Sequence, residues 1–136
     1  LVNFIGHSDT ASWTFSGLFS TNDAVTLTNA GRPFVTVQWG CWNTYYVDPV
    51  NKTLSDALLL SGDRGAAVVL GATTLSENES EAALGRLLTP LLAKSGLSVG
   101  QALQQAKSAL AKVNPGLADV QLGWTLMGDP AVVIEP

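Results

Sequence analysis

The chain has few of the residues that build metal clusters, disulfides or charged surfaces. Its 136 residues include one cysteine and one histidine, and only 13% are charged, with a net charge of −4. A single cysteine cannot close a disulfide within the chain, and one cysteine with one histidine cannot build a zinc cluster. Without a basic surface the chain also lacks the electrostatic footprint of a nucleic-acid-binding protein. We therefore expect no metal and no nucleic-acid partner.

Long apolar segments are missing as well. No apolar run approaches the roughly 18 residues of a membrane-spanning helix, so no membrane partner is expected. The first residues lack the basic flank and the small-residue cleavage site of a signal peptide. Position 1 already lies within a strand-like segment, and 46% of the residues are hydrophobic, enough for one compact core. We interpret residues 1–136 as a single but partial domain.

Short apolar runs alternate with segments of helical periodicity. Strands are predicted at residues 1–5, 34–39, 66–71 and 131–134, the third buried on both faces and the fourth at an edge. Helices are predicted from residue 21 or 22 to about 31, from 53 to 61, from 79 to 95, and from 99 to 113. This alternation predicts an α/β fold, a mostly parallel sheet with helices on both faces.

The histidine and the cysteine each follow one of these strands. The run 1–5 leads to His7, and the run 34–39 leads to Cys41. Ligands and reactive groups collect at the carboxyl ends of strands in open α/β sheets. A neighbouring imidazolium favours the thiolate and later protonates the leaving group, so the two side chains indicate a nucleophile–base pair. The alternative is that His7 is an ordinary loop residue and Cys41 a buried core thiol.

Three motifs, in order, resemble the gingipain-type cysteine peptidases, which have the caspase-like fold. They are Gly6-His7 followed by Trp13, then Gly40-Cys41, and the tail Gly123-Trp124-Thr125-Leu126-Met127-Gly128-Asp129-Pro130. The tail is also similar to the closing motif of the related CHAT domains. The resemblance covers nearly the whole chain and implies the C-terminal part of a caspase-like catalytic domain. Abundant Ser, Thr, Asn and Gly with little Lys and Glu is typical of secreted or cell-surface bacterial domains.

The resemblance also implies roles for individual residues. His7 would be the general base and acid, Cys41 the nucleophile, and the backbone amides of Ser8 and Cys41 the oxyanion hole. The family usually has glycine where this chain has Ser8, and a side chain there restricts the backbone. The orienting carboxylate and the first strands would lie in an upstream half of the domain, on the same precursor or a separate chain. Asp9 is close in sequence but is expected to be a loop residue.

The specificity pocket would be walled by the segment after the third strand and by residues beside the cysteine. The candidate pocket residues are Trp39, Trp42, Thr73, Thr74 and Glu77. The acids Glu77, Glu79 and Glu81 could attract a basic side chain of a substrate. Alternatively, Ser76 or Asn78 caps the next helix, and the acids complement its dipole. Trp13 is expected to pack under the histidine loop.

The first hypothesis is a cysteine endopeptidase that cleaves peptide or protein substrates through an acyl-enzyme, after basic residues and without a cofactor. The alternative is an inactive caspase-like or CHAT-like domain that acts as a binding or scaffolding module. Ser8, the missing upstream half and the lack of an orienting acid within the chain keep that alternative open. A flavodoxin-type ligand-binding domain is a weaker third interpretation, because no glycine-rich phosphate loop follows any strand.

Overall fold

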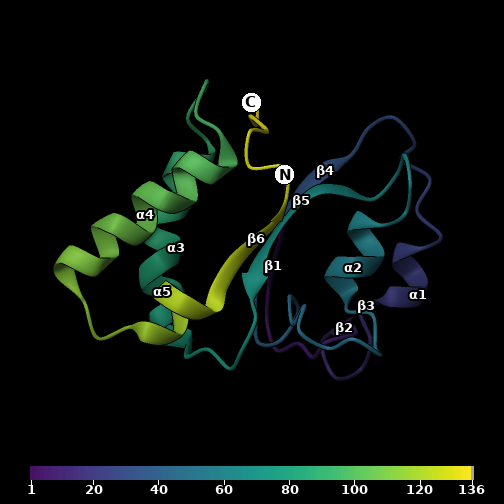
Figure 1. The fold of residues 1–136 in the computed structure, drawn as a ribbon, viewed down its shortest axis with the longest axis horizontal. Coiled ribbons are helices and arrows are strands. Elements are labelled where there is room, and N and C mark those ends of the chain that lie inside the picture. The colour runs from purple at the N-terminus through teal and green to yellow at the C-terminus, as the bar shows by residue number, and fades with distance from the viewer. Residues whose placement is uncertain (136) are drawn as a thin grey trace.

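The computed structural model of the chain describes residues 1–135, and its centre is a four-stranded sheet (Figure 1). The strands are β1 (Val2–Ile5), β4 (Phe34–Trp39), β5 (Ala66–Ala72) and β6 (Trp124–Gly128), in the order β1-β4-β5-β6. The first three run parallel, and β6 runs antiparallel to β5. The predicted α/β class with a mostly parallel sheet is confirmed.

Helices cover both faces of this sheet. They are α1 (Thr21–Ala24), α2 (Leu54–Leu59), α3 (Asn78–Leu92), α4 (Val99–Val113) and α5 (Ala118–Gly123). In Figure 1, α3, α4 and α5 lie on one side of the sheet, and α1 and α2 lie on the other. Capping boxes begin α1, α2 and α4. In each, the N-cap side chain accepts a hydrogen bond from the N3 amide, and the N3 side chain accepts one from the N-cap amide. No helix in residues 1–135 is long and apolar enough to cross a membrane.

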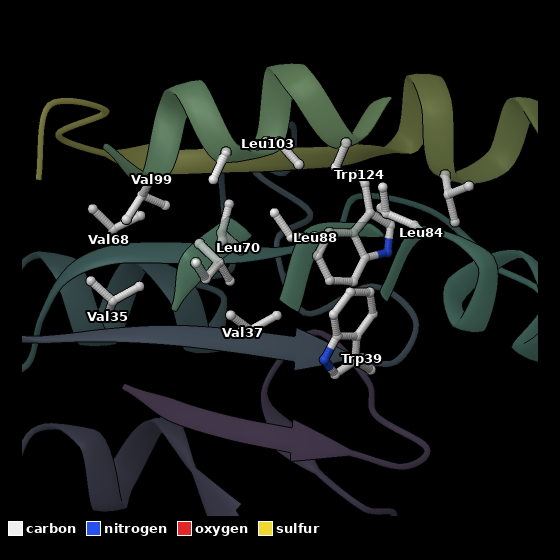
Figure 2. Close-up of a cluster of buried hydrophobic side chains, with 14 of the residues drawn as sticks. Val35, Val37, Trp39, Val68, Leu70, Leu84, Leu88, Val99, Leu103 and Trp124 are labelled. Atoms are coloured by element: carbon white, nitrogen blue, oxygen red, sulfur yellow. The ribbon is translucent and has the colours of Figure 1, made fainter. Parts of the chain in front are cut away.

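The larger core lies between the sheet and the pair α3 and α4 (Figure 2). Strand alternation points Val35, Val37 and Trp39 of β4 toward these helices. Trp39 packs on Trp124 at the start of β6, with ring centroids 4.2 Å apart. A smaller core on the other face joins β5 to α1 and α2. Strand β5 contributes to both cores, so its predicted burial on two faces is confirmed.

The predicted fourth strand, residues 131–134, is wrong. The strand that pairs with β5 is β6, within the Gly-Trp tail motif. Residues 130–133 instead run past the start of α4, where Val99 donates its amide to Val132 O at 2.8 Å. The apolar run has a high β propensity, but β6 occupies the position beside β5, so the run does not form a strand of the sheet.

Other boundaries differ from the predictions. The first helix ends at Ala24. The N-cap of α3 is Glu77, without a side-chain cap, so neither Ser76 nor Asn78 caps that helix. A hairpin of β2 (Ser12–Trp13) and β3 (Phe19–Ser20) follows the histidine loop, and α5 precedes β6. These elements were missed because two-residue strands and a six-residue helix carry too little periodicity to stand out.

Candidate active site

His7 and Cys41 leave neighbouring strands at the same edge of the sheet. Strands β1 and β4 pair in parallel, with Ile5 opposite Trp39. The amide of Gly6 extends this ladder by one hydrogen bond, to Trp39 O at 3.0 Å. Parallel strands end on the same side, so the loops that carry the two residues start side by side.

The two loops are in direct contact through Gly40. A Cβ atom at Gly40 would lie 2.4 Å from Gly6 O and 2.5 Å from Ser8 Oγ, closer than real side chains approach. Ser8 also donates its hydroxyl to Cys41 O at 2.8 Å. A glycine at position 40 is therefore what allows the histidine loop to pack against the cysteine loop.

Asn43, which was not predicted as a site residue, stabilises the contact between the histidine loop and the cysteine loop. The side chain is fully buried, and its Nδ2 lies 3.1 Å from Gly40 O and 3.2 Å from Ser8 Oγ. Its Oδ1 has no hydrogen-bond partner within residues 1–135.

The polar Gln38, inside an apolar strand, was the available signal of a buried network here. Its side chain accepts from Trp13 Nε1 and donates to Ser55 Oγ, which donates to Asn43 O.

The backbone turns sharply directly after the cysteine. Trp42 has a φ of 64°, in the left-handed region that costs a non-glycine residue about 1–2 kcal/mol. Its amide donates to Thr74 O at 3.2 Å, which compensates part of that cost. Strained residues of this kind cluster at functional sites, where the surrounding structure holds them.

The amides proposed for the oxyanion hole are free of internal partners. Within residues 1–135, neither the Ser8 amide nor the Cys41 amide donates to a protein acceptor. Ser8 is not among the non-glycine residues with positive φ. The serine that replaces the family's glycine therefore adopts its backbone conformation without left-handed strain.

The imidazole and the thiol have different neighbours. The exposed His7 ring stacks on Phe15, with centroids 5.6 Å apart and planes 18° from parallel. The partly buried Cys41 places its Sγ 3.7 Å from Ser76 O and 3.8 Å from Ser76 Oγ. Within residues 1–135 these two oxygens are the hydrogen-bond partners of the thiol, and His7 is not one of them.

Behind Ser76 lies a buried carboxylate. Glu81 is 7% exposed, and its Oε1 accepts from Ser76 Oγ at 2.7 Å and from Trp124 Nε1 at 3.2 Å. Burial raises the pKa of Glu81, while the hydrogen bonds from Ser76 and Trp124 oppose that rise. Its place on the apolar stripe of α3, together with Leu84 and Leu88, was a signal that this acid faces inward.

A cavity of about 740 Å³ opens beside the histidine. Its wall includes His7, Trp39 and Ile5 from the sheet edge, and Glu81, Gly85 and Arg86 from α3. Trp39 is the one residue of the predicted pocket set that lines it. Trp42, Thr73 and Thr74 lie outside this wall, and Glu77 is exposed, its amide bonded to Asp119 at 3.0 Å.

Two expectations about neighbours of His7 are confirmed. Trp13 packs beneath the histidine loop, stacked on Phe4 with ring centroids 4.6 Å apart, and it pairs with Ser8 in an isolated bridge. Asp9 is a loop residue, because its Oδ1 accepts the amides of Ala11 and Ser12 at 2.8 and 2.7 Å.

The sequence model of Peptidase family C25 matches residues 1–135. The chain belongs to this family, the gingipain family. The fold agrees: the Arg-specific cysteine proteinase gingipain R superposes with a TM-score of 0.75 at 19% identity, over 98% of this chain and 33% of that one. A complex of RgpB pro- and mature domains from Porphyromonas gingivalis gives 0.83 at 19% identity, over 97% and 33%.

A third structure, described only as a protease, gives a TM-score of 0.68 at 16% identity, over 96% of this chain and 34% of that one. The C25 chain thus spans about a third of the length of these structures, and its caspase-like fold is confirmed. No curated protein is similar enough in sequence to be matched.

Proposed function

We propose that the protein containing this chain is a cysteine endopeptidase with His7 and Cys41 as its catalytic dyad. The observation that carries the proposal is the contact of the two strand-end loops through Gly40, which brings a thiol and an imidazole to one sheet edge. Membership in Peptidase family C25 supports it. The reaction requires the sulfur to turn from Ser76 toward His7.

In the proposed reaction, the imidazole of His7 takes the proton of Cys41, and the thiolate attacks the carbonyl carbon of the scissile peptide bond. The tetrahedral intermediate collapses to an acyl-enzyme as His7 returns the proton to the leaving amine. Water, deprotonated by His7, then hydrolyses the thioester and frees Cys41. These steps use no metal and no organic cofactor.

The developing oxyanion would be bound by the amides of Ser8 and Cys41. Both lack an internal acceptor within residues 1–135, and the hydrogen bond between Ser8 Oγ and Cys41 O fixes their spacing. A preorganised donor of this kind contributes about 3 kcal/mol to transition-state stabilisation.

For specificity, we propose cleavage after basic residues. One structural neighbour is described as Arg specific. The proposed specificity pocket keeps the residues expected from the sequence, which are Trp39, Trp42, Thr73, Thr74 and Glu77. Within the cavity itself the acid is Glu81 rather than Glu77, so Glu81 is the better placed to attract a basic side chain.

The proposed partners are a peptide or protein substrate and an upstream half of the same domain. Strand β1 lies at the edge of the sheet, where further strands can pair with it. That upstream half would supply the carboxylate that orients His7. We propose a secreted or cell-surface bacterial location for the enzyme.

Hydrolysis of fluorogenic peptides by the intact protein tests the proposal. Peptides with Arg, Lys, Gln or Leu before the scissile bond separate basic from neutral specificity. We expect Cys41→Ser and His7→Ala to abolish hydrolysis while circular dichroism stays unchanged, and Glu81→Gln to lower the preference for basic over neutral peptides more than Glu77→Gln does. Hydrolysis that persists in Cys41→Ser would refute the assignment of Cys41 as the nucleophile. No hydrolysis by the intact protein, with a thiol indifferent to His7, would favour the scaffolding module.

A further inference from the structure

Ser76 and Glu81 form a polar pair behind the nucleophile that the proposed reaction does not use. Two oxygens of Ser76 lie within 3.8 Å of Cys41 Sγ, and the Ser76 hydroxyl donates to Glu81 Oε1 at 2.7 Å. The pair joins the loop after β5 to the first turn of α3.

The direction of each hydrogen bond follows from counting protons. A serine hydroxyl has one proton, and that of Ser76 is directed to the carboxylate of Glu81. Its Oγ can then only accept from the thiol of Cys41, and the carbonyl oxygen of Ser76 also only accepts. Both oxygens near the sulfur therefore favour the protonated thiol over the thiolate.

We infer that Ser76, oriented by Glu81, is a positioning residue that holds Cys41 as a protonated thiol in the resting site. The thiolate forms only when the sulfur leaves Ser76 for His7. This inference rests on the proposed function for its biological meaning, since a resting thiol matters only if Cys41 is the nucleophile. The action of Glu81 on the sulfur runs through Ser76 and is separate from its proposed role in the specificity cavity.

Several charged groups surround the pair. On α5, Asp119 adds to the rise in the pKa of Glu81 that burial causes. On the β1 loop, His7 lines the cavity into which Glu81 also faces, and Arg86 of α3 lines the same cavity. Trp124 of β6 donates to the carboxylate and is uncharged.

The pH dependence of Cys41 alkylation by iodoacetamide in the intact protein tests the inference. Ser76→Ala removes the accepting Oγ, so the pH of half-maximal alkylation should fall by about half a unit, and the rate at pH 7 should rise about threefold. The matched control is Ser80→Ala, a buried serine on α3 that is not among the hydrogen-bond partners of the sulfur within residues 1–135. Equal profiles for Ser76→Ala and Ser80→Ala would overturn the inference.

A double-mutant cycle tests whether Glu81 acts through Ser76. Glu81→Ala frees the Ser76 hydroxyl to donate to the thiolate, so the profile should move to lower pH. In the Ser76→Ala background the same change should produce a smaller shift. Equal shifts in both backgrounds would overturn the role of Glu81. Because alkylation needs no peptide substrate, these outcomes are independent of whether the protein hydrolyses peptides.

Discussion

Replacing Gly40 by alanine should force apart the loops that carry His7 and Cys41. The new Cβ would sit 2.4 Å from Gly6 O and 2.5 Å from Ser8 Oγ, whereas ordinary contacts begin at 3.4 Å. The loops must therefore separate by about 1 Å, and a backbone oxygen cannot give way as a flexible side chain can. Overpacking of this kind costs about 1–3 kcal/mol of unfolding free energy. A misplacement of 1 Å lowers a catalytic rate by about a hundredfold.

The assay measures urea unfolding and peptide hydrolysis on the same preparations of the intact protein. Gly116→Ala is the matched control, because its Cβ would meet nothing within 4 Å. We expect the control to stay within about 0.5 kcal/mol of the parent and to keep its activity. If Gly40→Ala behaved like Gly116→Ala in both measurements, the close contact of the loops would be refuted.

Three further substitutions probe the framework of the site, each by urea unfolding. Ser8→Ala leaves Asn43 Nδ2 without one of its acceptors and should cost about 1–3 kcal/mol, while the exposed Ser108→Ala should cost almost nothing. Lys107→Met removes the ammonium that donates to Gln121 O and Trp124 O, and it should also lower the unfolding free energy by about 1–3 kcal/mol. Lys112→Met, at an exposed position, should change it little, and equal losses of stability in the two variants would contradict a supporting role for Lys107. Burial raises the pKa of Glu81 above its ordinary 4.5, so the folded state binds more protons than the unfolded state, and the unfolding free energy should fall as pH rises from 4.5 through the raised pKa. Glu81→Gln should flatten this slope, whereas Glu79→Gln, at an exposed position, should not. An unchanged slope in Glu81→Gln would refute the raised pKa of Glu81.

The sheet and the place of the dyad could be predicted because both follow from local patterns. Short apolar runs ending in glycine marked β1, β4 and β5, and helical periodicity marked α3 and α4. Parallel neighbours then had to present His7 and Cys41 at one edge. Strand β6 was assigned to the wrong residues, since the choice between two apolar segments depends on which one fits beside β5.

The surroundings of the sulfur could not be predicted from the sequence. Ser76 matched the pattern of a helix cap, yet its hydroxyl bonds to Glu81, five residues further along. That choice depends on the burial of Glu81 against Trp124, which comes from the far end of the chain. The sequence around Asn43 itself gave no signal, because its contacts exist only once the two loops are in place; Gln38 alone indicated a buried polar network here.

The alkylation rate of Cys41 in the presence and absence of the imidazole tests most directly whether His7 and Cys41 act as a pair. At neutral pH we expect His7→Ala to slow the reaction with iodoacetamide about tenfold, the effect of a one-unit change in thiol acidity. In urea the parent protein and the variant should react at the same rate. Equal rates in the folded proteins would contradict the dyad, because Cys41 would then be a thiol that the imidazole does not activate.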